Sequence, residues 1–309
     1  GVVGLPMGCL SRKRAGGTRA AIGGMAMAGV RALADGDRWV GNAGFLRRAM
    51  EEARNFDLPV VLTSEDPALV DGKAHEGFVS AAKGLKTSPV AAEEVAVARH
   101  VALAELTGTR THLAKISSAP GVRLVRDAKA RGLPVTASVS IHNLALDETS
   151  IADYDPMAKI WPPARADEDR KALLAGVADG TLDAIVSDHA PRAVEDKEVE
   201  FDLASTGAMS IELVFALANR LILAGELDIV SAIRALTVGP RRVLGLKGGA
   251  VAVGMPADLV LLDPSANWVV DPGTLASRGC NTPFAGTEQV GRPVMTLRRG
   301  TVTFQRTEA

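Results

Sequence analysis

The chain has 309 residues, of which 47% are hydrophobic and 23% are charged, a balance that excludes a disordered or fibrous protein. Its 35 Lys and Arg residues are scattered among 36 Asp and Glu residues, for a formal net charge of -1. The sequence therefore offers no basic face for nucleic acid or for a membrane surface, and small molecules or proteins are the expected partners.

Amphipathic helices alternate with short apolar runs from residue 42 onward, which is the order of βα units around a parallel sheet. In the first helix Phe45, Leu46 and Met50 fall on one face. Helices are predicted at 42–56, 91–106, 120–131, 167–178, 211–223 and 229–236. Strands are predicted at 58–62, 111–116, 134–140 and 183–187.

The composition changes after Leu246 to Gly, Pro and short β-like runs at 258–262, 268–270, 293–297 and 301–304. We therefore predict two domains. Residues 1–246 would form an α/β barrel, and residues 247–309 would belong to a small β domain. Since the chemistry of a βα barrel lies at the carboxyl ends of its strands, the residues of interest are Thr63, Lys115, His142 and Asp188.

The two cysteines, Cys9 and Cys280, lie far apart, which argues against a disulfide framework and fits a reducing cytosol. The apolar stretch 20–34 is interrupted by Arg31 and falls short of the ~18 residues that a membrane span needs. No targeting segment is visible, so a cytoplasmic location is expected. The sequence begins with Gly in an apparent strand, as a piece of a longer protein would.

Six segments carry a family resemblance. They are SEDPAL (64–69), AHEG (74–77), VRLVRDAKARGLPVTA (122–137), DGTLDAIVSDHAP (179–191), GMPADLVLLD (254–263) and NTPFAGTEQVGRPVMTLRRG (281–300). Together they resemble the dihydroorotase family of the amidohydrolase superfamily. The resemblance implies a TIM (β/α)8-type barrel, present from about its third strand onward, with a flanking small β domain. It also implies a role in pyrimidine biosynthesis. The opening strands, with the family's His-x-His metal pair, are missing from this sequence.

Hydrolysis of a cyclic amide requires a divalent metal to activate water and a carboxylate to move protons. By the resemblance, a metal-binding histidine falls at Thr63 and a second falls at Lys115, so both are degenerate metal positions. Asp188, followed by His189, matches the family's catalytic carboxylate, here interpreted as vestigial. Asp35 is a loose match to a metal-ligating aspartate.

The positions that the resemblance assigns to substrate binding have also changed. An Asn-Pro-Pro-Leu-Arg stretch of the family runs here from Trp161 to Arg165, and a histidine after the SDHAP proline is replaced by Arg192. A pair of histidines is replaced by His142 and Asn143. If the indole of Trp161 points into the pocket, it fills space that a substrate needs.

The charges of the side chains at the two degenerate positions indicate whether a metal ion can bind. A lysine is cationic at neutral pH and has no lone pair to donate, and a threonine offers only a neutral hydroxyl. With Lys115 and Thr63 in one shell, we predict no metal cofactor. We further hypothesise that the Lys115 ammonium takes the place of the lost cation and pairs with Asp188, which would neutralise a buried carboxylate.

For the other polar residues, the sequence either predicts a structural role or leaves two roles open. His142 and His189 are either structural histidines or remnants of chemistry. A structural role is predicted for His75, His100 and His112. Glu65 and Asp66, adjacent on an extended segment, point to opposite faces and are predicted to anchor a loop.

The chain thus resembles the catalytically silent dihydroorotases that serve as assembly and stability partners of aspartate transcarbamoylase, and an oligomer is expected. The alternative is an active dihydroorotase that uses zinc, with further ligands from the missing strands. A third hypothesis is a protein that binds an orotate-like ligand without chemistry.

Overall fold

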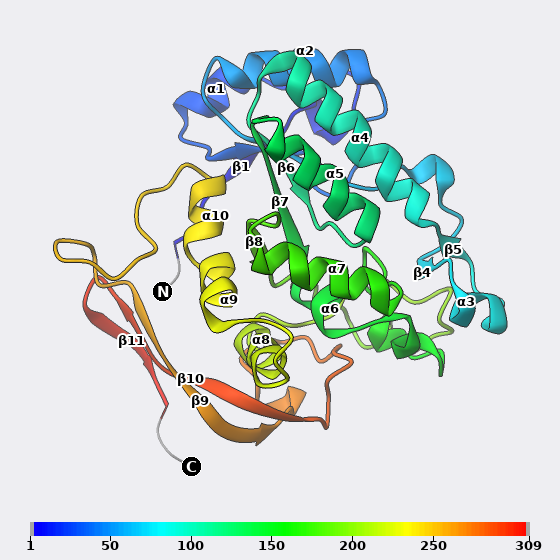
Figure 1. Ribbon diagram of the computed structural model, residues 1–309, viewed down its shortest axis with the longest axis vertical. Helices are drawn as coiled ribbons and strands as arrows, with labels where there is room; N and C mark the ends of the chain where they lie inside the picture. The colour runs from blue at the N-terminus through cyan, green and yellow to red at the C-terminus, as the bar shows by residue number, and fades with distance from the viewer. Residues whose placement is uncertain (1–2, 307–309) are drawn as a thin grey trace.

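The computed structural model describes residues 3–306, whose strands form a six-stranded, a three-stranded and a two-stranded sheet (Figure 1). The six-stranded sheet is parallel throughout. Its strands, in spatial order, are β1 (Met7–Gly8), β2 (Ala32–Leu33), β3 (Val60–Thr63), β6 (Thr111–Ala114), β7 (Val135–Ser140) and β8 (Ala184–Val186). Because all six strands are parallel, their carboxyl ends lie on one side of the sheet, as in a βα barrel.

Helices follow one another around the outside of this sheet, as Figure 1 shows for α2, α4, α5 and α7. The helices of this layer are α1 (Ile22–Met27), α2 (Ala43–Arg54), α4 (Val90–Thr107), α5 (Ala119–Ala130), α7 (Asp167–Ala178), α9 (Ile229–Leu236) and α10 (Val238–Val243). Helix α2 begins where Asn42 accepts a hydrogen bond from the Phe45 amide, and it buries the apolar face predicted from its sequence. One large core of apolar side chains lies between helices and strands.

The antiparallel sheet runs in the order β11 (Thr301–Gln305), β10 (Glu288–Arg298), β9 (Leu259–Val269), and α8 (Val214–Leu223) packs on β10. Asn219 of α8 donates from Nδ2 to the carbonyl oxygens of Pro264 at 3.0 Å and Val290 at 2.8 Å. The runs predicted at 258–262 and 268–270 form one strand, β9, and the run predicted at 293–297 is part of the longer strand β10; each strand has 11 residues. Register shifts at 290–292 and 293–295 interrupt the alternation that a strand pattern relies on.

A satellite layer of short elements lies beside the barrel. It consists of β4 (Ala74–His75), β5 (Thr87–Ser88), α3 (Phe78–Lys83) and the 3-10 turns at Pro67–Leu69, Glu148–Ile151 and Pro156–Ala158. Its own small core contains Ala74, Ile151, Ala158 and Phe201. Helix α6 (Ile141–Ala145) follows β7 directly, and the remaining 3-10 turns are Arg12–Arg14 and Pro272–Thr274.

The fold class predicted from the sequence is confirmed, and most element boundaries agree within three residues. Helix α7 has the predicted bounds. Helix α8 begins at Val214 rather than 211; residues 211–213 form a turn, and the amides of Ser210 and Ile211 donate to the His189 side chain. No helix within residues 3–306 is long and apolar enough to cross a membrane.

Candidate functional site at the ends of the parallel strands

The four strand-end residues lie where the sequence predicts. Thr63 is the last residue of β3, Lys115 follows β6, His142 is in α6 after β7, and Asp188 is two residues beyond β8. Lys115 and Asp188 have φ values of 60° and 50°. Residues other than glycine rarely adopt this left-handed conformation, and such residues gather at functional sites. The backbone therefore adopts a rare left-handed conformation at both Lys115 and Asp188, the two residues whose side chains meet.

Lys115 and Asp188 form the predicted ion pair, with 2.9 Å between Nζ and Oδ1 and side chains only 15% and 18% exposed. Nζ also donates to the carbonyl oxygen of Trp161 at 3.0 Å and lies 4.5 Å from the centre of its indole ring. Burial raises the pKa of Asp188, and the Lys115 charge opposes that rise. The ammonium thus neutralises a carboxylate that burial disfavours.

The Trp161 side chain points into the site and is bound there by Glu65. Indole Nε1 donates to Glu65 Oε1 at 2.6 Å, and Lys73 Nζ donates to the same oxygen at 2.8 Å. The Ser88 hydroxyl donates to the other oxygen at 2.8 Å. Glu65 does hold loops together, but it also reaches the site, which the sequence interpretation missed. Its signal was a carboxylate two residues after a strand-end ligand position.

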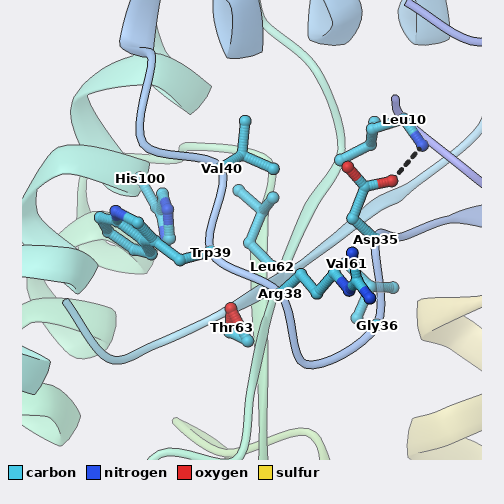
Figure 2. Close-up of a pocket in the computed structure, with 10 residues that line it drawn as sticks. All are labelled: Leu10, Asp35, Gly36, Arg38, Trp39, Val40, Val61, Leu62, Thr63 and His100. Carbon is cyan, nitrogen blue, oxygen red and sulfur yellow. Dashed lines mark hydrogen bonds between the residues drawn. The ribbon is translucent and has the colours of Figure 1, made fainter. Parts of the chain in front are cut away.

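Thr63 and Asp35 line one small cavity of about 10 Å³ (Figure 2). The Asp35 carboxylate accepts hydrogen bonds from the amides of Leu10, at 2.9 Å, and Ser11, at 3.0 Å, and from the Ser11 hydroxyl. Figure 2 shows this carboxylate turned toward the Leu10 nitrogen. Asp35 therefore serves to fix the turn after β1.

His142 and Asn143 are both buried at the start of α6. The His142 ring stacks on Phe284 with centroids 6.3 Å apart, and burial lowers its pKa to about 4, helped by the charges of Lys115 and His189. His142 is therefore neutral at physiological pH. Asn143 donates from Nδ2 to the carbonyl oxygens of Pro163 at 2.9 Å and Pro162 at 3.3 Å, which fixes the segment that carries Trp161.

Arg165 and Arg192 are bound to the scaffold. Arg165 is buried, and its Nε donates to the Ser117 hydroxyl at 2.8 Å while Nη1 donates to the Ser88 carbonyl oxygen at 3.2 Å. Arg192 donates from Nε to the Thr206 carbonyl oxygen at 2.8 Å. Both guanidinium groups thus stabilise loops around the site.

His112, for which the sequence predicts a structural role, and His189, whose role it leaves open, both have protein partners. His112 lies 3.0 Å from each of the hydroxyls of Thr136 and Ser138. His189 Nδ1 accepts from the amides of Ser210 at 3.2 Å and Ile211 at 3.3 Å, which favours the structural alternative for this residue.

The side chains at the strand ends do not suit a divalent cation. An ammonium group occupies one oxygen of Asp188 and would repel a metal ion placed beside it. In the part of the chain that the structure describes, no group of three or more His, Cys, Asp or Glu side chains is arranged to hold an ion.

Comparison with known proteins defines the class. Residues 11–303 match the model of the amidohydrolase family. The structure superposes on L-hydantoinase (dihydropyrimidinase) from Arthrobacter aurescens with a TM-score of 0.87 at 23% identity, over 98% of this chain and 70% of that one. A D-hydantoinase (dihydropyrimidinase) from Thermus sp. gives a TM-score of 0.74 at 23% identity, over 97% of this chain and 63% of that one. The fold is therefore that of an amidohydrolase.

Sequence relatives narrow the class to a family. The dihydroorotase of Syntrophotalea carbinolica is 42% identical over 301 residues, which are 97% of this chain and 71% of the relative. The dihydroorotase of Anaeromyxobacter sp. strain K is 43% identical over 307 residues, 98% of this chain and 71% of the relative. The chain belongs to the dihydroorotase family.

Proposed function

We propose that this dihydroorotase homologue of pyrimidine biosynthesis does not hydrolyse dihydroorotate and serves as an assembly and stability partner of aspartate transcarbamoylase. The observation that carries the proposal is the 2.9 Å ion pair between Lys115 and Asp188. An ammonium group supplies the positive charge that a metal would supply, but it has no vacant coordination position at which water could be activated.

The ion pair also interferes with proton transfer by Asp188. A general base must be free to accept a proton from its substrate or from water. Asp188 instead accepts a hydrogen bond from a neighbouring cation, and Thr63 contributes a neutral hydroxyl in place of an imidazole. We therefore treat Asp188 as a vestigial catalytic residue and expect no zinc cofactor.

A scaffold needs outer surfaces rather than a working pocket. Several helices expose large apolar side chains, among them Met27 of α1, Leu106 of α4 and Leu223 of α8. Contact with a partner would remove such surface from water. The choice of aspartate transcarbamoylase follows from the likeness to silent dihydroorotases. A cytoplasmic oligomer that binds neither nucleic acid nor membrane belongs to the same proposal.

The test combines metal content, turnover and association. Elemental analysis of the full-length natural protein should find far less than one zinc per chain, and dihydroorotate ring opening should not exceed the rate without protein. The transcarbamoylase should co-purify with this chain and lose thermal stability without it. Stoichiometric zinc together with turnover would overturn the proposal, and so would a transcarbamoylase that is unaffected by the chain.

An active zinc-dependent dihydroorotase is the second candidate, favoured by identities of 42% and 43% to two proteins of that name. In that case residues outside the present sequence would have to supply the metal ligands. Binding of an orotate-like ligand without chemistry is distinguished from both by a thermal shift of zinc-free protein in the absence of turnover.

A further inference from the structure

The indole of Trp161 has the surroundings of a bound ligand. Its N–H donates to the buried Glu65 carboxylate at 2.6 Å. Two ammonium groups lie over the ring, with Lys115 Nζ at 4.5 Å and Lys73 Nζ at 5.3 Å from its centre. Ser88 holds the second oxygen of Glu65 and so fixes the acceptor. Hydrogen bonding at the ring edge and cations at the ring face together recognise one kind of molecule.

We propose that these residues form a binding site for a flat heteroaromatic ring bearing an N–H group, and that the protein's own Trp161 occupies it. The inference rests on the proposed function, because it takes the strand ends to be free of metal. Glu65 is the positioning residue of this site: it accepts the ring N–H and also binds Lys73.

Charge makes this environment different from ordinary packing of a tryptophan. A hydrogen bond to an ionised acceptor is roughly twice as strong as one between neutral groups. Cations over an indole face add attraction that grows as water is excluded. Trp268 provides the contrast. It also has a cation over its ring, Arg292 at 4.1 Å, but its N–H donates to a neutral carbonyl, that of Gly291, at 3.1 Å.

The experiment is ligand replacement in a cavity variant. Trp161→Ala should bind added indole, measured by calorimetry and by an upward shift of the melting temperature, whereas the wild-type protein should not. 1-Methylindole, which has the same ring without the N–H, should bind at least tenfold more weakly to Trp161→Ala. In Trp268→Ala, the matched control, any binding should be weaker than in Trp161→Ala and should not respond to a change at Glu65.

A second variant keeps the proposal testable if Trp161→Ala does not fold. With Trp39→Phe and Trp268→Phe leaving Trp161 as the only tryptophan, Glu65→Gln should shift the tryptophan emission to longer wavelength and increase its quenching by iodide. An unchanged spectrum would overturn the proposal. So would equal affinity of folded Trp161→Ala for indole and 1-methylindole, or no binding of either. Turnover with bound zinc would instead overturn the proposed function, and that result is read from a separate assay.

Discussion

At the scale of single residues, one ammonium group changes what the site can do. Lys115 lies with its charge against Asp188 and its remaining protons toward the Trp161 carbonyl and ring. A buried ion pair contributes little net stability, yet removing one partner is costly because the other charge is left in a medium of low polarity. Lys115 is therefore held by the carboxylate that it neutralises.

Replacing Lys115 by Met should destabilise the protein by about 2 kcal/mol at pH 8, a figure reduced from that for a fully buried pair because both side chains keep some solvent contact. Burial raises the pKa of Asp188, and without Lys115 it should rise further. The penalty should therefore shrink as the pH falls and Asp188 becomes protonated. Urea unfolding at pH 8 and pH 5.5 measures both effects.

The double variant Lys115→Met with Asp188→Asn is the control for that change. It removes both charges together, so it should recover most of the loss at pH 8 and show little of the added pH dependence. A single variant as stable as the wild type at pH 8 would show that the pair carries no such coupling.

The contact between site residues was predictable from sequence where the end of a strand fixed the position of each residue. Lys115 and Asp188 each follow a parallel strand, so their convergence is a consequence of topology, and opposite charges in that place pair. The Glu65 contact with Trp161 joins residues 96 positions apart through two irregular loops. No periodicity encodes such loop geometry, which is why the sequence indicated only a loop anchor and a bulky indole of unknown direction.

At the scale of elements, a single glutamate joins two helices to the sheet. Glu93, in the first turn of α4, accepts hydrogen bonds from the amides and hydroxyls of Ser117 and Ser118, at 2.5 to 3.0 Å. These residues connect β6 to α5, and Ser118 caps α5. Burial raises the pKa of Glu93, while the Arg165 charge and hydrogen bonds from Ser117 and Ser118 oppose that rise.

Glu93→Gln should lower the free energy of unfolding by about 2 kcal/mol, because an amide accepts at one oxygen only and turns its NH2 toward donors. Glu94→Gln is the matched control on the same helix. Glu94 pairs at the surface with Arg123, so its change should cost about 0.5 kcal/mol or less. Equal effects of the two substitutions in urea unfolding would contradict a special role for the buried carboxylate.

Two lysines fasten the loop from residue 193 to residue 207. Lys197 is 1% exposed, and its Nζ donates to the carbonyl oxygens of Ser205 at 2.9 Å and Gly207 at 3.1 Å. Lys159 Nζ binds the carbonyl oxygens of Phe201 and Asp202. The loop has little regular structure, so these ammonium groups supply hydrogen bonds that a ladder would otherwise provide.

Lys197→Met should therefore loosen the loop with a smaller effect on the barrel. Hydrogen exchange of amides at 193–207 should accelerate about tenfold, the change expected when a local opening becomes easier by ~1.4 kcal/mol. Lys171→Met, which removes a lysine paired with Asp167 at the surface, should leave exchange in this loop unchanged. Acceleration spread evenly over the sheet would mean global destabilisation instead.

Long elements were predictable from sequence and short ones were not. Helix α2 shows apolar periodicity and an Asn cap, and α7 opens with three acidic residues in its first turn; each helix has 12 residues. Strands β1 and β2 contain two residues each, which is too few to show a periodic pattern in the sequence. They form because they pair with neighbouring strands of the sheet. The 11-residue strand β9 was predicted as two runs with Pro264 between them, and of the 11-residue strand β10 only the part from Pro293 onward was predicted, whereas the structure keeps both strands paired across register shifts.

At the scale of the whole molecule, three buried, neutral histidines make stability depend on pH. Burial lowers the pKa of His100 to about 3 and those of His112 and His142 to about 4. In the unfolded chain a histidine takes up its proton near pH 6.5. Between these values the unfolded state binds more protons, so stability falls as the pH falls. Glu93 and Asp188, whose pKa values burial raises, act in the opposite direction.

The contribution of one histidine, His112, to the pH dependence of stability is isolated by comparing the unfolding free energies of the wild type and His112→Gln across pH. His112 lies against Thr136 and Ser138, so the variant should be less stable at pH 7. Between about pH 6 and pH 4.5 the wild type alone carries the penalty of a deprotonated His112, and the gap should narrow by ~1.4 kcal/mol per pH unit. The contributions of carboxylates are the same in both proteins and cancel in this difference.

The control is Thr109→Val, which removes a buried hydroxyl that donates to the Met50 carbonyl oxygen. Its difference in unfolding free energy from the wild type should stay constant with pH, since a threonine hydroxyl does not titrate in this range. A pH-independent gap for His112→Gln would mean that this histidine takes up its proton equally in the folded and unfolded states.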